Sequence, residues 1–352
     1  MKNYRTIIIG IFTILLIGAA TANAATWTVT KSTDSNDNIC DADCSLREAV
    51  FKAQSGDTVV FNSSLIGQTF TLGGSQMVIN NQITIDGNLD GVNVAFISGS
   101  NTSRIFYLNT TNSALTLKNA ILVQGNSSAV FADVNSSLTL DRVRIAGNSS
   151  NFGGAVTLRN GTHHITNTSF SGNTGTSCSA IELGNGGNLY MANVTVTNNH
   201  SGAGGGIVCN GGSNMFIRNS TIAYNDSDSS GAMFIFASGN VNIGNSIVAQ
   251  NTGSVGADFD FVSGTITSVG GNLIGNLDTV PANTFNKPMD IFGVNPLLAP
   301  SNATLGGHPV FYHPLQAGSP ARNGGVNANA VDPFDNTPLT TDARGTGFPR
   351  IA

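Results

Sequence analysis

The sequence has little charge of either sign. Only 10% of its 352 residues are Asp, Glu, Lys or Arg, against roughly 25% in an average soluble protein. The formal net charge is -5, which gives no reason to expect nucleic acid as a partner, because binding to phosphates needs a basic surface. With 40% apolar residues, the low charge also argues against a disordered acidic or basic tail. The length suffices for a large core, in one long domain or two shorter ones.

Sequence motifs for several chemistries are also missing. There is no phosphate-binding loop, no nucleophile elbow and no H-E-x-x-H zinc motif. The Asn-Thr-Asp, Asp-Asp and Gly-His-Gly signatures of polygalacturonases are absent as well. No apolar segment long enough to span a membrane follows the N-terminal region.

Residues 1–24 have the three parts of a secretory signal. Two basic residues precede an apolar run from Ile7 to Ala20, and Ala22 and Ala24 form an A-x-A cleavage site. We predict cleavage before Ala25 and export of the rest. A retained membrane anchor is the weaker alternative, because the apolar run is shorter than the roughly 18 residues of a spanning helix.

The sequence has only four cysteines, and an exported chain permits disulfides. Cys40 and Cys44 can close a small loop, and Cys178 and Cys209 fall on neighbouring turns of the repeat described next. A zinc site is the alternative, but no His accompanies the first pair and no spacing is C-x-x-C.

Asparagines recur at intervals of about 25 residues, each after a short apolar run, and such internal periodicity indicates a repeat architecture. The main column consists of Asn126, Asn148, Asn173, Asn199, Asn225, Asn251 and Asn276. A second column precedes it in phase and consists of Asn119, Asp141, Asn167, Asn193, Asn219 and Asn245.

Within each repeat the apolar residues alternate, as in Leu138 to Leu140 and Val194 to Val196, which is typical of short strands. One repeat cannot bury a face alone, whereas stacked repeats form one continuous core. The pattern predicts an all-β fold, a parallel β-helix. The period is too short for a β-propeller blade, and the L-x-x-L-x-L pattern of leucine-rich repeats is missing.

The asparagine columns have a structural interpretation. Asn tolerates left-handed dihedrals, and its amide can bond both its own turn and the Asn of the next coil. We therefore expect the main column to form a ladder that satisfies backbone groups at the corners. Amides that line a sugar-binding groove are the alternative interpretation.

The N-terminal region predicts a short helix that covers the first coil. Ser45 to Glu48 has the form of a capping box, and Leu46, Ala49, Val50 and Ala53 share one apolar face. A strand from Thr58 to Phe61 follows.

Cys44 to Ala49, followed by Gly56 to Phe61, resembles the N-terminal signature of bacterial CSLREA-motif proteins. These are similar to right-handed parallel β-helix proteins of the pectin-lyase type and to polymorphic outer-membrane proteins. Gly318 to Ala321 and Thr341 to Gly345 resemble the closing segment of choice-of-anchor β-helix proteins. The resemblance implies a right-handed β-helix and a secreted or surface location. Arg322 and Asn323 depart from the apolar residue and Asp that usually follow in this family.

These observations divide the chain into four parts. We expect a signal peptide over residues 1–24, an N-terminal cap over 25–57, a β-helix of about eight or nine coils over 58–285, and a C-terminal cap and tail over 286–352.

Candidate catalytic or metal-binding groups are few. Asp226 and Asp228 lie in one loop and Asp258 and Asp260 in a later one, and four carboxylates on the same side would suit Ca²⁺. Solvated turn residues are the simpler interpretation, since Asp is common in such turns. No other cofactor is expected.

Two further groups of ionisable residues are expected to be structural. His163 and His164 are adjacent, so their side chains point to opposite faces of a strand. Asp332, Asp335, Asp342 and Arg344 fall in the segment that the resemblance assigns to the cap, which favours structural ion pairing.

A regular scaffold without a clear catalytic constellation favours a secreted or surface-exposed, non-enzymatic protein that takes part in adhesion or in glycan or matrix binding. The expected partner is an extracellular glycan or a host or matrix surface. The alternatives are a polysaccharide lyase or glycoside hydrolase that uses the two Asp loops on an acidic glycan, and a structural spacer without a ligand.

Overall fold

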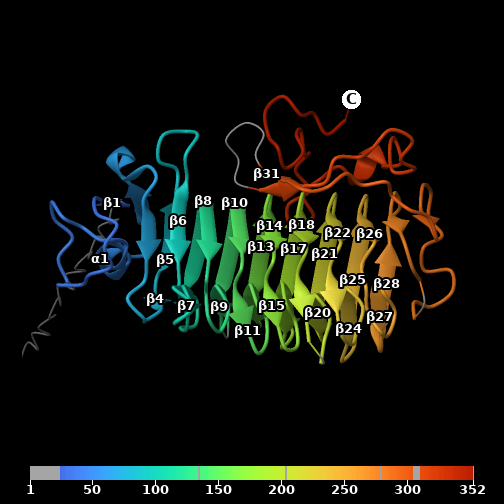
Figure 1. The fold of residues 1–352 in the computed structure, drawn as a ribbon, viewed down its shortest axis with the longest axis horizontal. Coiled ribbons are helices and arrows are strands. Elements are labelled where there is room, and N and C mark those ends of the chain that lie inside the picture. Colours follow the sequence, from blue (N-terminus) through green and yellow to red (C-terminus); the bar gives the residue numbers. More distant parts are fainter. Residues whose placement is uncertain (1–23, 134, 203, 278, 304–309, 352) are drawn as a thin grey trace, which may run out of the picture.

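The computed structural model describes residues 24–133, 135–202, 204–277, 279–303 and 310–351. The expected signal sequence, except Ala24, lies outside the described residues. The described chain winds into a parallel β-helix of about eight coils, as the repeat predicted, and Figure 1 shows the coils stacked side by side along the long axis.

Each complete coil contributes strands to three faces of the β-helix. Face 1 consists of β1 (Thr26–Val29), β2 (Thr58–Phe61), β5 (Gln82–Asp86), β8 (Ala114–Val123), β10 (Ser137–Ala146), β13 (Thr162–Thr166), β17 (Asn188–Ala192), β21 (Asn214–Arg218), β25 (Gly239–Gly244) and β28 (Gly264–Ser268).

Face 2 continues from face 1 after a bend, and the long strands β8 and β10 run through both faces. Its other strands are β3 (Thr69–Thr71), β6 (Ala95–Ser98), β14 (Ser169–Ser171), β18 (Thr195–Thr197), β22 (Thr221–Ala223), β26 (Ile247–Ala249), β29 (Leu273–Ile274) and β30 (Ile291–Phe292).

Face 3 closes each coil. It consists of β4 (Met77–Ile79), β7 (Phe106–Leu108), β9 (Val130–Ala132), β12 (Val156–Arg159), β16 (Ile181–Gly184), β20 (Val208–Gly211), β24 (Met233–Phe236) and β27 (Phe259–Phe261). Between faces 2 and 3 lies a small sheet of β11 (Ser149–Ser150), β15 (Thr174–Gly175), β19 (His200–Ser201) and β23 (Asp226–Ser227).

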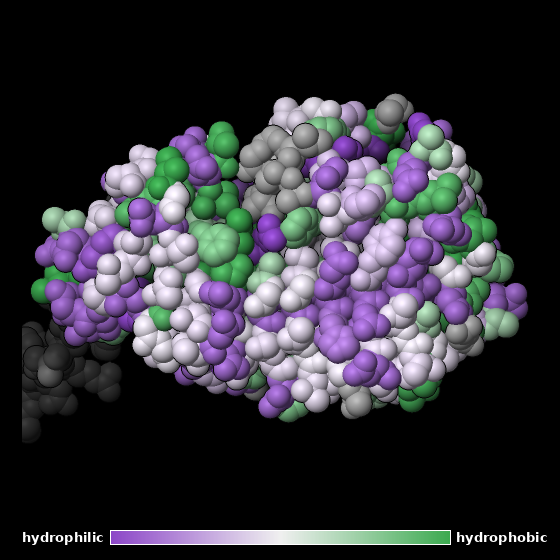
Figure 2. All heavy atoms as spheres, in the orientation of Figure 1, coloured by the Kyte–Doolittle hydropathy of each residue, from purple (hydrophilic) through white to green (hydrophobic). Residues whose placement is uncertain are grey.

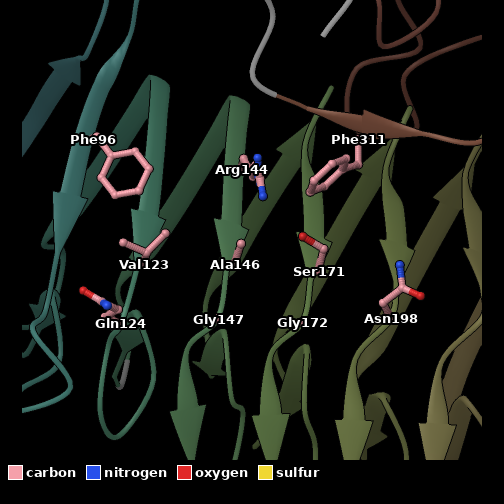
Figure 3. A pocket seen from close by; sticks show the side chains of 10 residues that line it. All are labelled: Phe96, Val123, Gln124, Arg144, Ala146, Gly147, Ser171, Gly172, Asn198 and Phe311. Atoms are coloured by element: carbon pink, nitrogen blue, oxygen red, sulfur yellow. The ribbon is translucent and has the colours of Figure 1, made fainter. Parts of the chain in front are cut away.

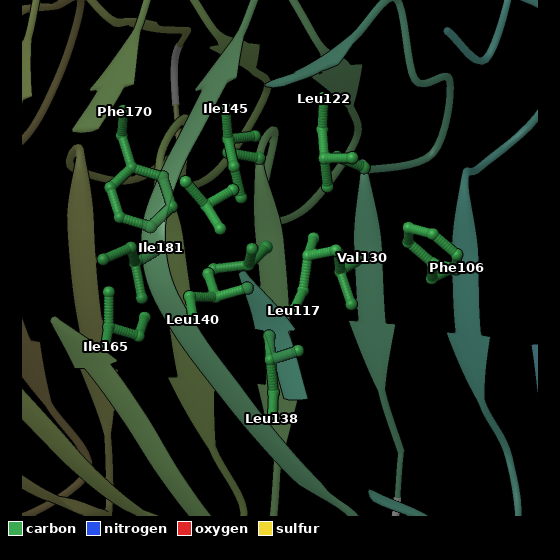
Figure 4. Close-up of a cluster of buried hydrophobic side chains, with 14 of the residues drawn as sticks. Phe106, Leu117, Leu122, Val130, Leu138, Leu140, Ile145, Ile165, Phe170 and Ile181 are labelled. Atoms are coloured by element: carbon green, nitrogen blue, oxygen red, sulfur yellow. The ribbon is translucent and has the colours of Figure 1, made fainter. Parts of the chain in front are cut away.

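The core fills the inside of the coils because alternate side chains of every face point inward. On face 2, Leu122 pairs with Ile145, and Ile145 with Phe170, and all three are 0% exposed (Figure 4). Burial of each such side chain contributes about 1.5–3 kcal/mol. The next coil thus supplies the apolar surface that a single repeat lacks.

An internal asparagine ladder runs through the turn that follows face 2. The Nδ2 of Asn148 donates to the Oδ1 of Asn173 at 3.0 Å, and Asn173, Asn199 and Asn225 make the same bond to the next Asn at 2.9 Å. Each of these amides also donates to a backbone carbonyl; that of Asn199 bonds the carbonyl of Phe170 at 3.0 Å. The column thereby satisfies backbone groups that are buried between coils.

The two ends of this ladder differ from the sequence expectation. The prediction for Asn126 was wrong, because Asn126 is exposed and the backbone N–H of Gly125 donates to Asn148 Oδ1 at 2.7 Å instead. At the far end, Asn251 donates to the carboxylate of Asp258 at 2.8 Å, and this carboxylate also accepts from the backbone N–H of Asn276 at 2.7 Å.

The second column lies at the bend between faces 1 and 2, where the backbone has positive φ. The prediction for Asp141 was wrong by one residue, because Arg142 has the positive φ of 54° and Asp141 accepts a bond from Asn167 Nδ2 at 2.9 Å. The residues with the left-handed conformation at this bend are Asn119, Arg142, Asn167, Asn193, Asn219 and Asn245.

The N-terminal end is covered by α1 (Leu46–Lys52), which begins with the predicted capping box. Ser45 Oγ accepts from the backbone N–H of Glu48 at 3.1 Å, and Glu48 accepts from the backbone N–H of Ser45 at 2.7 Å. Arg47 forms an ion pair with Asp34 at 2.8 Å. A Cys40–Cys44 disulfide precedes the helix, and a Cys178–Cys209 disulfide links two neighbouring coils, so both hypothesised pairs are present.

The last residues of the chain divide into a closing segment and a tail. Phe285 is buried and packs on Phe259 with ring centroids 5.7 Å apart at the end of the core. From there the chain runs back along the flank, where β31 (Asn302–Ala303) pairs antiparallel with β32 (Phe311–Tyr312), as the orange-to-red segment of Figure 1 shows. The short 3-10 helices are η1 (Ser63–Leu65) and η2 (Asn327–Asn329).

The tail is attached to the second asparagine column. Asn245 donates to the carbonyl of Val326 at 2.9 Å and accepts from its N–H at 2.8 Å, and Asn219 donates to the carbonyl of Asn329 at 3.1 Å. None of the helices in the described residues has the length and apolar character needed to cross a membrane.

Candidate functional site

The four acidic residues that suggested calcium do not converge. Asp226, in β23, and Asp228, just after it, are exposed, whereas Asp258 and Asp260 are buried, 2% and 7% exposed. Asp258 closes the internal ladder, and Asp260 lies in β27 beside Phe234. The expectation of a four-carboxylate site was wrong, because the second Asp pair belongs to the coil itself and not to a loop over it.

The structure instead places an imidazole beside the first pair. His200 Nδ1 lies 3.0 Å from Asp226 Oδ2, and His200 Nε2 lies 4.0 Å from Asp228 Oδ2. The pKa of Asp226 is lowered by hydrogen bonds from the hydroxyl of Thr252 and from His200. All three groups are exposed, and His200 lies between the two carboxylates and pairs with each of them, so we interpret them as a surface ion-pair cluster.

The adjacent histidines point to opposite sides, as expected. His163 is 0% exposed and occupies a core position, where burial lowers its pKa to about 4. His164 points outward, where the tail covers it: Nε2 lies 2.8 Å from Asp332, and the ring stacks on Phe334. The other tail ions are also paired locally, since Arg344 bonds Asp342 and Asp335 accepts from Thr337.

A groove on the outer surface of face 2 has the features of a binding site. Its volume is about 550 Å³, within the 300–1,000 Å³ typical of ligand sites. We call it the flank groove, and Figure 3 shows the residues that line it: Phe96, Val123, Gln124, Arg144, Ala146, Gly147, Ser171, Gly172, Asn198 and Phe311.

The register of face 2 determines the shape of the groove. Phe96 of β6 and Arg144 of β10 lie in one outward row, with Ile121 between them. Phe311 of β32 covers the next position of that row, since its backbone N–H donates to Ser169 Oγ at 3.0 Å. The row spans three strand spacings from Phe96 to Ser169, roughly 14 Å at 4.7–4.9 Å per spacing. Figure 3 shows Arg144 between the two rings.

The floor and rim of the groove differ in chemistry. Val123, Ala146 and Ser171 form a floor of small and apolar side chains. Gln124 and Asn198 are exposed at the rim, in the turn that follows face 2. In the two coils between them, the equivalent positions of this turn are Gly147 and Gly172, which have no side chain, so that edge of the groove stays open. In the space-filling view, hydrophobic residues gather over β6 and β8, whereas much of the surface over the later coils is polar (Figure 2).

Arg144 is the one ionisable group among the described residues that line the groove. Its guanidinium lies 3.9 Å from the ring centroid of Phe311, and burial lowers its pKa. The described part of the lining therefore offers aromatic faces, amides and one cation. Such groups can bind a polar ligand through stacking, hydrogen bonds and charge.

Sequence reasoning missed this groove. Phe96 and Phe311 are far apart in the chain, and β32 reaches face 2 only because the tail runs back along the flank. The only sequence signal is a change of residue type along the outward row of face 2. The early coils place large side chains there (Phe96, Ile121 and Arg144), whereas the later coils place small polar ones (Ser169, Thr195 and Thr221). Comparison with protein-family models, curated proteins and solved structures found no match for this chain.

Proposed function

We propose that the protein is a secreted or surface-exposed, non-enzymatic β-helix protein that binds a glycan in the flank groove. The observation that carries the proposal is the placement of two aromatic rings, Phe96 and Phe311, on either side of Arg144 in an open groove with amides on its rim.

Each part of the groove has a counterpart in a sugar chain. The apolar C–H faces of a sugar ring bury surface against an aromatic side chain. Gln124 Oε1 accepts from the hydroxyl of Ser98 at 2.7 Å, which fixes the amide and directs its N–H groups to other acceptors, such as sugar hydroxyls. Asn198 supplies a second amide three coils further on, so the rim follows the length of an extended chain.

Two observations support an extracellular location. All four cysteines are in disulfides, which persist mainly in oxidising compartments, and the first 24 residues have the composition of a secretory signal. The resemblance to CSLREA-motif proteins agrees with this location. A long, rigid scaffold of stacked coils is also suited to presenting a groove away from a surface.

A lyase or hydrolase is less well supported by the groove. Glycoside hydrolysis uses two carboxyl groups on either side of the scissile bond, and the described lining of the groove holds Arg144 as its sole ionisable residue. The exposed cluster of His200, Asp226 and Asp228 lies on the turn between faces 2 and 3, and the groove lining does not include it. We therefore favour binding over catalysis.

A glycan array followed by calorimetry on the best ligand tests the proposal. Phe96→Ala should weaken binding about tenfold by removing one stacking surface. Phe152→Ala is the matched control, because Phe152 is 57% exposed but lies outside the groove, and it should leave affinity unchanged. The absence of any glycan ligand, or the appearance of new reducing ends or unsaturated products, would contradict the proposal.

A further inference from the structure

Arg144 differs from the other described arginines. Arg47, Arg142, Arg159 and Arg344 each form an ion pair with a carboxylate. Arg104, Arg218 and Arg350 donate hydrogen bonds to carbonyl or amide oxygens, and Arg322 is exposed. Arg144 is half-buried, yet its only recorded partner in the described structure is the ring of Phe311.

The guanidinium of Arg144 is incompletely satisfied. Its Nε is buried and has no hydrogen-bond acceptor among the described residues, and a buried N–H donor without an acceptor costs about 1–3 kcal/mol. Stacking on Phe311 holds the planar group in place but supplies no acceptor oxygen. The group is therefore held in the groove, and its terminal Nη donors, which also make no hydrogen bond to any described residue, face the open side where a ligand can reach them.

Among the described residues, no carboxylate forms an ion pair with this cation. Asp141 lies three residues earlier, at the bend between faces 1 and 2, and is engaged by Arg142 at 2.9 Å and by Asn167 at 2.9 Å. The groove thus carries a local positive charge in a chain whose net charge is -5. In a partly desolvated site, such a charge selects for an anion more strongly than it would in open water.

From this geometry we infer that the ligand of the flank groove is an anionic glycan, in which a carboxylate or sulfate group pairs with Arg144 while the sugar ring lies against Phe96 or Phe311. The inference rests on the proposed glycan-binding function and adds the chemical class of the sugar. Planar guanidinium groups bind carboxylate and sulfur or phosphorus oxyanions through two parallel N–H donors, which fits a ligand held across the groove beside the stacked ring.

Two matched pairs of probes test the charge and its source. Oligogalacturonate is compared with its methyl ester, which has the same ring without the charge, and dextran sulfate is compared with dextran. We expect at least one anion to bind about tenfold or more tightly than its neutral partner, and this preference to fall as salt is added. The first pair reports on carboxylates and the second on sulfates.

Arg144→Gln should abolish the preference, and thermal melting should confirm that this variant is folded. Arg142→Gln is the matched control, because it removes the same charge from the same strand at a residue that the groove lining does not include. It should keep the preference.

The possible failures are distinguishable. Equal affinity for the charged and neutral partners, with loss of binding in Phe96→Ala, would overturn the anionic assignment and leave the proposed function standing. A preference that survives Arg144→Gln would also overturn the inference. No binding by any of the four probes or by the array would overturn both.

Discussion

The side-chain amide of Asn251 donates to the carboxylate of Asp258 at 2.8 Å, and there the internal asparagine ladder changes from amides to an acid. Each Asn of the ladder uses its Oδ1 to accept bonds from the coil before it, so the last Asn needs an acceptor that no further Asn provides. Asp258 supplies two acceptor oxygens, one for Asn251 and one for the backbone of Asn276. A carboxylate therefore ends the ladder without leaving donors unpaired.

We predict that Asp258→Asn destabilises the protein by about 1–3 kcal/mol, because the amide replaces one acceptor oxygen with an NH₂ group that faces an N–H donor. Unfolding monitored by circular dichroism should show a melting temperature lower by several degrees. Asp228→Asn makes the same chemical change at an exposed residue and should shift stability by less than about 0.5 kcal/mol. Equal effects of the two variants would contradict this role for Asp258.

Asn199→Ala should cost about 2–4 kcal/mol, because it removes one acceptor and two donors in the middle of the ladder. The backbone N–H of Asn173 would then be buried without a partner. Asn214→Ala is the control, since Asn214 belongs to a half-exposed ladder on the outside of face 1. We expect it to cost under about 1 kcal/mol in the same denaturant titration, and glycan binding to be unchanged in both variants.

The architecture was predictable because every coil repeats the same constraint. A buried turn needs its N–H and C=O groups paired in each coil, so Asn148, Asn173, Asn199 and Asn225 recur and reveal where the chain lies on its previous turn. The helix after Ser45 was equally readable, because the capping box is a local interaction over three residues.

The errors in the ladders have a common physical origin. When the repeats are aligned by residue type, Asn126 and Asp141 fall in the two columns. In the structure the equivalent positions, fixed by backbone hydrogen bonds between coils, are Gly125 and Arg142. A backbone N–H can join the ladder from any residue, so Gly125 fills a position that an amide pattern does not reveal. One-residue shifts of this kind are invisible until the strand pairing of β8 with β10 is known.

The flank groove was not predictable because it depends on the path of the tail. Phe311 meets Arg144 only after the chain has left the last coil and returned along face 2, and no periodicity describes that return. The tail is attached to Asn219 and Asn245 of the second column. In the sequence these two residues cannot be told apart from the other asparagines of the repeat.

The Cys178–Cys209 disulfide should contribute about 3–4 kcal/mol, because the residues are separated by 31 positions and the bond restricts a long loop of the unfolded chain. Replacing both cysteines by Ser should lower stability by this amount, and thiol titration of the native protein should find no free thiol. The Cys40–Cys44 pair closes a loop of only four positions and serves as a comparison with a smaller expected loss. Equal losses from the two double variants would contradict the loop-length argument.

The buried imidazole of His163 should make stability depend on pH. Burial lowers its pKa from 6.5 to about 4 in the folded protein, so between these values the unfolded chain binds a proton that the folded chain does not. Stability should therefore fall as the pH drops through this window and level off below about pH 4. The loss expected for this one group is about 3 kcal/mol, at 1.36 kcal/mol per pKa unit.

His163→Asn isolates this effect from that of the carboxylates. Asn places an amide oxygen near the position of Nδ1, which accepts from the backbone N–H of Leu138 at 3.2 Å, and it does not titrate. His163→Leu is a second variant, since Leu138 and Leu189 occupy the same inward row in the adjacent coils. In denaturant titrations from pH 7 to pH 4, both variants should lose less stability than the wild type, by about 3 kcal/mol. Parallel pH profiles for the three proteins would show that the imidazole is not held neutral in the core.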